Sequence, residues 1–223
     1  MNYRAVIFDL DGTLLDTLED LAGAMNQVLQ RLGFPEHPPE AYKYFIGDGM
    51  VNLARRALPA AERREEFVAR AAEDLRAEYG RRWQRLTHPY PGIPELLGVL
   101  HRLQIKLGVL TNKADSIAKV MVAAFFPEIT FGVVAGALPG RPLKPDPTGA
   151  LALAQELAVP PNVLVFVGDS GNDMQTARAA GMYGAGALWG FRTADELREA
   201  GAEILLEKPA DLLTLWNEVK SGK

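Results

Sequence analysis

The sequence predicts an α/β protein in which a Rossmann-like parallel sheet forms the core and an all-helical cap domain is inserted after the first strand. Two observations support this fold class. From about residue 105 onward, short apolar runs alternate with segments of helical periodicity, a pattern typical of a parallel sheet with helices on both faces. Between residues 40 and 86 the periodicity is helical, with no strand pattern. The cap is therefore predicted at residues 15–87, and the α/β core at 1–14 and 88–223.

A strand followed by a helix is predicted at the start of the chain. Residues 5–8 form a short apolar run that ends at Asp9, as expected for a buried strand. Apolar residues then recur at helical spacing over residues 18–32, and Gly33 is placed to end that helix in the left-handed conformation.

The second half of the insert carries one apolar face. Its residues recur every three or four positions and predict a single long helix: Phe67, Ala71, Leu75, Tyr79, Trp83 and Leu86. The opposite face is charged, and the pairs Glu66 with Arg70 and Glu78 with Arg82 have the spacing that stabilises a helix surface.

The sequence from about residue 105 onward predicts the remaining strands and helices of the core. Strands are expected at residues 105–110, 131–135, 163–167, 183–188 and 204–206. Helices are expected at residues 114–124, 148–157 and 173–180 and from 210 onward. One more helix should follow the capping box that Thr193 and Glu196 form. Ligands of such sheets bind beyond the carboxyl ends of the strands, so residues that carry chemistry are expected there.

The composition is that of a globular protein and excludes several classes. The chain has 223 residues, of which 48% are hydrophobic and 23% charged, and a net charge of −4, so bulk charge gives no sign of nucleic-acid binding. The absence of cysteine excludes a disulfide scaffold, a thiol nucleophile and a Cys-based zinc site. Without a membrane-spanning run or a signal-peptide pattern, we expect a cytoplasmic monomer or homodimer that binds neither nucleic acid nor membrane.

The first strand ends in two acids. Asp9 and Asp11 are two residues apart, so both point to the same side of the extended chain. Carboxylates that close repel each other unless a hard divalent cation relieves the repulsion, and a carboxylate can attack phosphorus. Gly12 permits a tight turn whose N–H groups face an anion. By itself the segment fits a simple turn with acidic caps equally well.

Two further strand ends carry groups that suit a phosphate. Thr111 and Asn112 follow one strand, and their hydroxyl and amide groups could hold a phosphoryl oxygen, although a helix N-cap explains them better in isolation. Lys144 lies in a proline-framed loop ahead of a helix, where a positive point charge suits phosphate. Taken alone, it is better explained as a solvated turn lysine.

The fourth strand end carries Asp169 and Asp173 in a glycine-punctuated loop that opens a helix. Mg²⁺ needs few protein carboxylates because water and substrate complete its octahedron. The joint occurrence of two acids, a threonine, a lysine and two more acids at four strand ends of one sheet favours a phosphate and Mg²⁺ site over four independent turns.

These stretches resemble the four motifs of the haloacid dehalogenase superfamily, in matching order and spacing over essentially the whole chain. The motifs are Asp9-x-Asp11-Gly12-Thr13, Thr111, Lys144 and Gly168-Asp169-x-x-x-Asp173. The superfamily also places an all-helical cap between the first two strands, as predicted for this chain.

The resemblance implies a role for each matching residue. Asp9 would be the nucleophile and a metal ligand, and Asp11 the acid/base partner, which also binds Mg²⁺ through its backbone carbonyl. Thr111 and Lys144 would hold the phosphoryl group, with Gly12, Thr13 and Asn112 as further substrate contacts. Asp169 would bind the metal, with Asp173 as a nearby or alternative ligand. Because metal-independent dehalogenases lack an acid at the position of Asp11, dehalogenation is not expected.

Softer signals narrow the resemblance to bacterial phosphoglycolate phosphatases. These are Thr111-Asn112-Lys113, Ile46-Gly47-Asp48-Gly49 and Trp189-Gly190-Phe191. In such caps the glycine segment and a following arginine lean over the substrate, which here implies Gly47, Gly49 and Arg55. Equally, the glycines could break a helix and Arg55 could be solvated.

The expected function is Mg²⁺-dependent hydrolysis of a small phosphate monoester through an aspartyl-phosphate, with phosphoglycolate as the first candidate. A β-phosphoglucomutase-like phosphomutase or a pyrophosphatase is the alternative within catalysis. A phospho-accepting signalling or binding module is the alternative outside it. Asp11 argues against signalling, because activation of water would shorten the life of the phosphorylated state.

Overall fold

The computed structural model describes residues 3–217. Its internal contacts divide the chain into two compact units. The core unit consists of residues 1–14 and 89–223, and the helical unit of residues 15–88. No helix within the described residues is long and apolar enough to cross a membrane.

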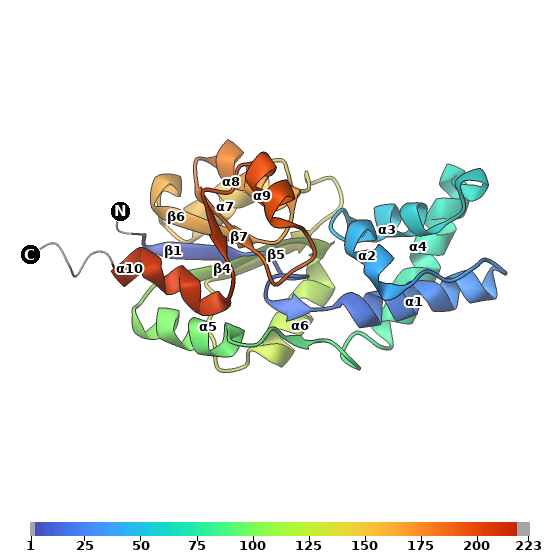
Figure 1. The fold of residues 1–223 in the computed structure, drawn as a ribbon, viewed down its shortest axis with the longest axis horizontal. Coiled ribbons are helices and arrows are strands. Elements are labelled where there is room, and N and C mark those ends of the chain that lie inside the picture. The colour runs from blue at the N-terminus through green and yellow to red at the C-terminus, as the bar shows by residue number, and fades with distance from the viewer. Residues whose placement is uncertain (1–2, 218–223) are drawn as a thin grey trace, which may run out of the picture. The chain divides into compact units, whose positions relative to one another are not determined.

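Six parallel strands form the sheet of the core unit in the order β5-β4-β1-β6-β7-β8 (Figure 1). Their bounds are β1 (Ala5–Phe8), β4 (Lys106–Ala114), β5 (Val133–Ala137), β6 (Leu164–Gly168), β7 (Tyr183–Ala187) and β8 (Ile204–Leu206). The central strands β1 and β6 are buried along their whole length, because helices cover both faces of the sheet. The predicted α/β fold class is confirmed.

Helices lie on both sides of this sheet (Figure 1). One layer holds α7 (Thr148–Glu156), α8 (Gly171–Ala180) and α9 (Ala194–Ala200); the other holds α5 (Ile93–Arg102), α6 (Asp115–Phe125) and α10 (Thr214–Asn217). Short 3₁₀ turns, η2 (Pro161–Val163) and η3 (Pro209–Leu213), precede β6 and α10. Ile7 and Phe166 of the sheet pack in one core cluster with Leu153 of α7 and Ala177 of α8.

The register of the sheet brings the strand ends with polar residues together. Phe8, the last residue of β1, pairs with Val109 of β4 on one side and Val167 of β6 on the other. Asp9 therefore leaves the sheet between the ends of β4 and β6, as the rule for parallel sheets requires.

The helical unit contains four helices and a 3₁₀ turn. They are α1 (Leu18–Arg31), α2 (Pro39–Phe45), α3 (Gly49–Ala57), η1 (Ala60–Glu62) and α4 (Glu65–Gly80). The α4 helix packs against both α1 and α3. A separate two-stranded sheet joins β2 (Leu15–Asp16) to β3 (His88–Pro89). Residues 40–86 form only helices and loops, as the periodicity predicts.

The predicted extent of the last helix in the insert is wrong. The α4 helix ends at Gly80, so Leu86 is not on its apolar face and is 56% exposed. Further along the chain, a buried acid of α1 holds residues 86–87: one carboxylate oxygen of Asp20 accepts 2.9 Å hydrogen bonds from the Leu86 amide, the Thr87 amide and the Thr87 hydroxyl. Glu78 forms ion pairs with Arg31 and Arg81, whereas the sequence predicts an ion pair of Glu78 with Arg82.

Two elements of the core also differ from the prediction. The β4 strand continues to Ala114, past its predicted end at Leu110, so the polar residues 111–113 belong to the strand. Its register against β5 shifts between Leu110 and Ala114. The α5 helix is not among the predicted elements, although its buried residues have helical spacing: Ile93, Leu96, Leu97 and Leu100.

Replacement of Asp20 tests the anchor between α1 and the end of the insert. We expect Asp20→Ala to lower the free energy of unfolding by about 2–4 kcal/mol, because three donors lose a buried acceptor. Urea denaturation followed by circular dichroism measures the loss. The matched control is Glu19→Ala, at an exposed position in the same turn, with an expected change below about 1 kcal/mol. Equal effects of the two substitutions would contradict the assignment.

Candidate active site

Asp9 is buried at the carboxyl end of β1, with only 7% of its surface exposed. Its Oδ1 atom accepts a 2.7 Å hydrogen bond from the Leu10 amide and lies 2.8 Å from Lys144 Nζ. Burial raises the pKa of Asp9 to about 7 in spite of the opposing effect of Lys144, and Asp173 adds to the rise. A further positive charge nearby would therefore favour the ionised, nucleophilic form.

Lys144 bridges two carboxylates. Its Nζ atom donates a 2.6 Å hydrogen bond to Asp173 Oδ1 while it pairs with Asp9. Asp173 Oδ2 in turn accepts from the Ser170 amide at 3.0 Å and from the Ser170 hydroxyl at 2.6 Å. Burial acts to lower the pKa of Lys144, but Asp173 and Asp9 outweigh it and raise the pKa. The ammonium group therefore stays charged beside the Asp9 carboxylate.

Asp169, the first residue after β6, is almost fully buried, with 1% exposed. The Thr13 hydroxyl donates a 2.9 Å hydrogen bond to its Oδ1 atom, and the Phe191 amide donates a 2.8 Å bond to Oδ2. Burial raises the pKa of Asp169 to about 8, with contributions from Asp173 and Asp9. The Thr13 hydroxyl thus orients Asp169, and the substrate contact expected for Thr13 stays a prediction.

Two glycines permit the close packing around Asp169. A Cβ atom on Gly12, whose φ is 82°, would overlap the Asp169 carboxylate. A Cβ atom on Gly190 would overlap both the Asp169 side chain and the Gly12 carbonyl oxygen. The neighbouring Trp189 donates from Nε1 to the Thr13 carbonyl at 2.9 Å. Residues 189–191 thus hold the first and fourth strand ends together, a role that the sequence did not reveal.

Asp11 lies apart from the other acids and pairs with a second buried lysine. Lys113 Nζ lies 2.8 Å from Asp11 Oδ1 and 3.1 Å from Oδ2. The sequence reasoning assigned no chemical role to Lys113. Its position two residues after Thr111, within a polar strand end, and its place in the Thr111-Asn112-Lys113 stretch that supports the family resemblance are signals that could have suggested one.

Thr111 and Asn112 are both buried at the end of β4. The Thr111 hydroxyl accepts a 3.2 Å hydrogen bond from the Lys113 amide. The Asn112 side chain donates to the Lys144 carbonyl at 3.1 Å and accepts from the Lys144 amide at 2.9 Å. Its side chain thus positions the loop that carries Lys144, and the expected substrate contact of Asn112 stays a prediction.

The donors present fit a divalent cation. Carboxylate oxygens of Asp9, Asp169 and Asp173 lie within 4.8 Å of one another. Lys144 and Lys113 pair with Asp9, Asp173 and Asp11, so two ammonium charges face four carboxylates and a divalent ion would balance the remainder. Oxygen ligands at this spacing suit Mg²⁺. The Asp11 side chain is outside the triad, and the predicted contact through its backbone carbonyl stays a prediction.

The predicted substrate contacts of the insert belong to the helical unit. Gly47 and Gly49 have positive φ values of 123° and 80°; Gly47 lies between α2 and α3, and Gly49 is the first residue of α3. Arg55 of α3 makes two 2.8 Å hydrogen bonds to the Glu65 carboxylate. Because an exposed ion pair contributes little free energy, a substrate carboxylate could replace Glu65. The predicted role of Arg55 stays a prediction.

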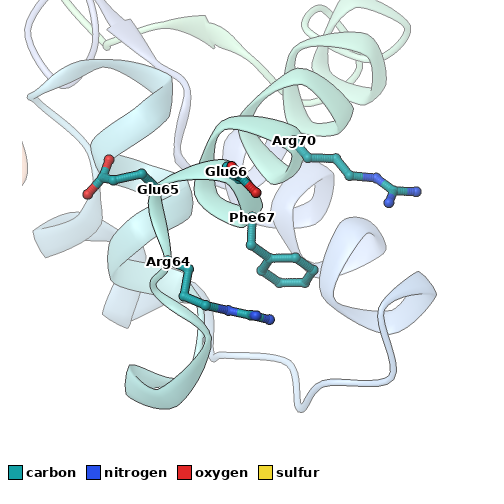
Figure 2. A pocket seen from close by; sticks show the side chains of 5 residues that line it. All are labelled: Arg64, Glu65, Glu66, Phe67 and Arg70. Atoms are coloured by element: carbon teal, nitrogen blue, oxygen red, sulfur yellow. The ribbon is translucent and has the colours of Figure 1, made fainter.

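A shallow hollow of about 570 Å³ lies beside the start of α4 (Figure 2). The side chains of Arg64, Phe67 and Arg70 extend to one side of the helix there, and Glu65 points away from them (Figure 2). The hollow is open to solvent and contains none of the predicted site residues.

The fold of the core unit and its cluster of four acids and two lysines define a class of protein. Residues 6–187 match the haloacid dehalogenase-like hydrolase family, and the chain belongs to it. The predicted class of phosphoric monoester hydrolase is confirmed by this match together with the relatives described next.

Several of those relatives share one name. Phosphoglycolate phosphatase of Chromobacterium violaceum is 34% identical over 95% of this chain and 96% of its own length. The Aquifex aeolicus protein of the same name is 32% identical, over 96% and 97%. A crystal structure from Lactobacillus delbrueckii subsp. bulgaricus has a TM-score of 0.89 at 32% identity, covering 95% of this chain and 97% of that one. CbbY from Rhodobacter sphaeroides, solved with phosphate, has a TM-score of 0.75 at 26% identity, covering 94% and 96%.

Substitution of Gly190 tests the packing around Asp169. We expect Gly190→Ala to lower phosphatase activity at least tenfold and stability by about 1–3 kcal/mol, because the methyl group displaces Asp169 or the Gly12 turn. Aryl phosphate hydrolysis and thermal unfolding measure the two effects. The control is Gly98→Ala on α5, where the nearest atom to an added Cβ is an Arg102 nitrogen 3.6 Å away. Wild-type activity in Gly190→Ala would show that Asp169 needs no such confinement.

Proposed function

We propose that this enzyme hydrolyses 2-phosphoglycolate through a phosphoryl group carried on Asp9, with Mg²⁺ as its cofactor. One observation carries the chemistry: a buried carboxylate at a strand end is paired with Lys144, and a second carboxylate, Asp11, follows two residues later. The substrate comes from the relatives, since proteins that share about a third of the sequence over nearly the full length are named phosphoglycolate phosphatase.

In the first half of the reaction an Asp9 carboxylate oxygen attacks phosphorus. A bond from phosphorus to Asp9 forms as the bond to the ester oxygen breaks, and that oxygen takes a proton from Asp11 and leaves as the alcohol of glycolate. Lys144 stands beside the Asp9 oxygen, where its charge offsets negative charge on the transferring phosphoryl group. Thr111, at the adjacent strand end, supplies a hydroxyl for a phosphoryl oxygen.

In the second half, Asp11 acts as a base. Its carboxylate takes a proton from a water molecule whose oxygen attacks phosphorus, and the bond to Asp9 breaks. Inorganic phosphate leaves, Asp9 regains its carboxylate, and Asp11 is protonated for the next cycle. One carboxyl group thus serves first as acid and then as base, a division of labour that requires its separation from the lysine-bridged acids.

Asp9, Asp169 and Asp173 are the residues that would hold Mg²⁺ in this proposal, with the backbone carbonyl of Asp11 as a further ligand. Phosphatases of this family generally use Mg²⁺. The ion would neutralise charge on the phosphoryl oxygens and on the acids themselves. The raised pKa values of Asp9 and Asp169 support this, because they indicate carboxylates that lack sufficient positive charge.

Residues 15–87 are proposed to act as a cap domain that selects the substrate. Gly47 and Gly49 would let a backbone segment approach the ligand closely, and Arg55 would exchange Glu65 for the carboxylate of glycolate, since both are bidentate acceptors. Cytoplasmic location and a monomeric or homodimeric state remain proposals that rest on the absence of cysteine and on the class of substrate.

Replacement of Asp9 tests the nucleophile. We expect Asp9→Asn to lower kcat at least about a thousandfold with every phosphate ester, because an amide cannot form the phosphorylated intermediate. Phosphate release in the presence of Mg²⁺ measures the loss. The control is Asp16→Asn, at a half-buried acid outside the proposed site, with activity close to wild type. Substantial turnover by Asp9→Asn would overturn the proposed chemistry.

The pH dependence of Mg²⁺ binding follows from the two raised pKa values. Between the ordinary carboxyl pKa near 4 and the folded-state pKa values of about 7 and about 8, the metal-free folded state holds protons that the unfolded state has lost. Its stability therefore falls as pH rises through this range. Mg²⁺ competes with the same protons, so we expect its stabilising effect to grow with pH.

Thermal unfolding with and without MgCl₂ measures this linkage. The rise in Tm caused by Mg²⁺ should be larger at a pH above both folded-state pKa values than at one below them, and Asp169→Asn should remove most of the difference. A Mg²⁺ effect that does not change across this range would mean that these carboxyl groups do not hold the ion.

A panel of phosphorylated metabolites tests the substrate. We expect kcat/KM to be highest for 2-phosphoglycolate and to fall for sugar phosphates and pyrophosphate. Arg55→Gln should raise KM for 2-phosphoglycolate about tenfold or more, through loss of a charge-assisted pair, and leave ethyl phosphate unaffected. Preference for a sugar phosphate with transfer to a second hydroxyl would favour a phosphomutase.

A further inference from the structure

Lys113 is a buried lysine that has no role in the mechanism of phosphoryl transfer described above. Its side chain is 2% exposed, although lysine is rarely buried to this extent unless it is paired. Burial of an ammonium group is costly, and a carboxylate partner with good geometry offsets the cost. The ion pair with Asp11 therefore accounts for the burial of Lys113.

We propose that Lys113 is a positioning residue for Asp11, which holds the carboxylate where it can exchange a proton with the leaving oxygen and then with water. The inference rests on the proposed function, because it assumes the acid/base role of Asp11. The ammonium contacts both carboxylate oxygens, at 2.8 and 3.1 Å, and so restrains the rotation of the group as well as its place.

The two lysines of the site pair with different acids. Lys144 contacts Asp9 and Asp173, the acids of the phosphoryl and metal side. Lys113 contacts Asp11. Neither lysine makes an ion pair with the acid of the other within the described residues. Loss of Lys113 should therefore disturb proton transfer and leave attack by Asp9 intact.

Asp11 needs such a restraint because it lies in the loop after β1. Its side chain is 13% exposed, so without a partner the carboxylate would turn toward water. Proton transfer requires donor and acceptor within hydrogen-bond reach, and a shift of about 1 Å is enough to cost rate. The tie to β4 spans 102 positions of the sequence and keeps Asp11 at the sheet edge.

The leaving group reveals whether the acid is in place. An alkyl phosphate must release an alkoxide unless its oxygen is protonated, whereas p-nitrophenolate is stable as an anion and leaves without a proton. The ratio kcat/KM reports binding and the first phosphorus–oxygen cleavage only. A misplaced Asp11 should therefore lower kcat/KM for alkyl phosphates and spare the aryl phosphate. Hydrolysis of phospho-Asp9 needs Asp11 as base with either substrate.

The experiment compares Lys113→Met and Lys113→Gln with wild type on 2-phosphoglycolate, ethyl phosphate and p-nitrophenyl phosphate, with Mg²⁺. For Lys113→Met we expect kcat/KM to fall about thirtyfold or more on both alkyl phosphates and less than about threefold on the aryl phosphate. Because dephosphorylation slows, the aryl phosphate should give a burst of nitrophenol equivalent to the enzyme present. Lys113→Gln keeps an uncharged N–H donor group and should lie between Lys113→Met and wild type.

Two controls keep the outcomes distinct. Lys119→Met removes a surface lysine that pairs with Asp115 and is 57% exposed, and it should leave all three substrates unaffected. Thermal unfolding establishes that each variant is folded; if Lys113→Met is not, Lys113→Gln carries the test. Asp9→Asn, assayed alongside, separates failure of the proposed function from failure of this inference.

Equal losses on alkyl and aryl phosphates would overturn the inference, since Lys113 would then act in the phosphoryl transfer that all three substrates share. A loss confined to 2-phosphoglycolate would also overturn it, because Lys113 would then bind the substrate carboxylate. Loss on both alkyl phosphates, with a nitrophenol burst, supports it.

Discussion

The site depends on the mutual repulsion of buried carboxylates. Asp9, Asp169 and Asp173 are brought within a few ångströms of one another by the ends of β1 and β6, and Lys144 relieves only part of the repulsion. Burial without full compensation raises the pKa values of Asp9 and Asp169. Such an arrangement favours a ligand that brings positive charge, and a divalent cation held by these acids would supply it.

The remaining features of the core unit hold these charges in place. Thr13 and Phe191 fix the two oxygens of Asp169, Ser170 fixes Asp173, and Asn112 fixes the backbone that presents Lys144. The contacts of Thr13, Phe191 and Asn112 join different strand ends, whereas that of Ser170 is local to the start of α8. Preorganisation of this kind is what electrostatic catalysis requires, because the charges need not reorganise during the reaction.

Much of the fold could be predicted because buried parallel strands are continuous apolar runs. The bounds of β1 and β6 differ from the predicted ones by at most one residue. The path of the chain after α4 could not be predicted, since residues 86–87 are held by Asp20, which lies 66 residues from Leu86. Site residues at strand ends were found from their chemistry, but the partners of Thr13, Asn112 and Lys113 are distant in sequence. Their side chains support other protein groups, and composition alone cannot separate that use from contact with substrate.

The central claim is that a phosphoryl group passes through Asp9. Acid quenching of the enzyme during turnover of p-nitrophenyl phosphate, followed by peptide mapping with mass spectrometry, tests this directly. The account predicts one added phosphoryl group on the peptide that carries residues 5–14, located on Asp9, and none in Asp9→Asn. Turnover with a phosphoryl group on another residue, or with none trapped at any quench time while Asp9→Asn remains active, would contradict it.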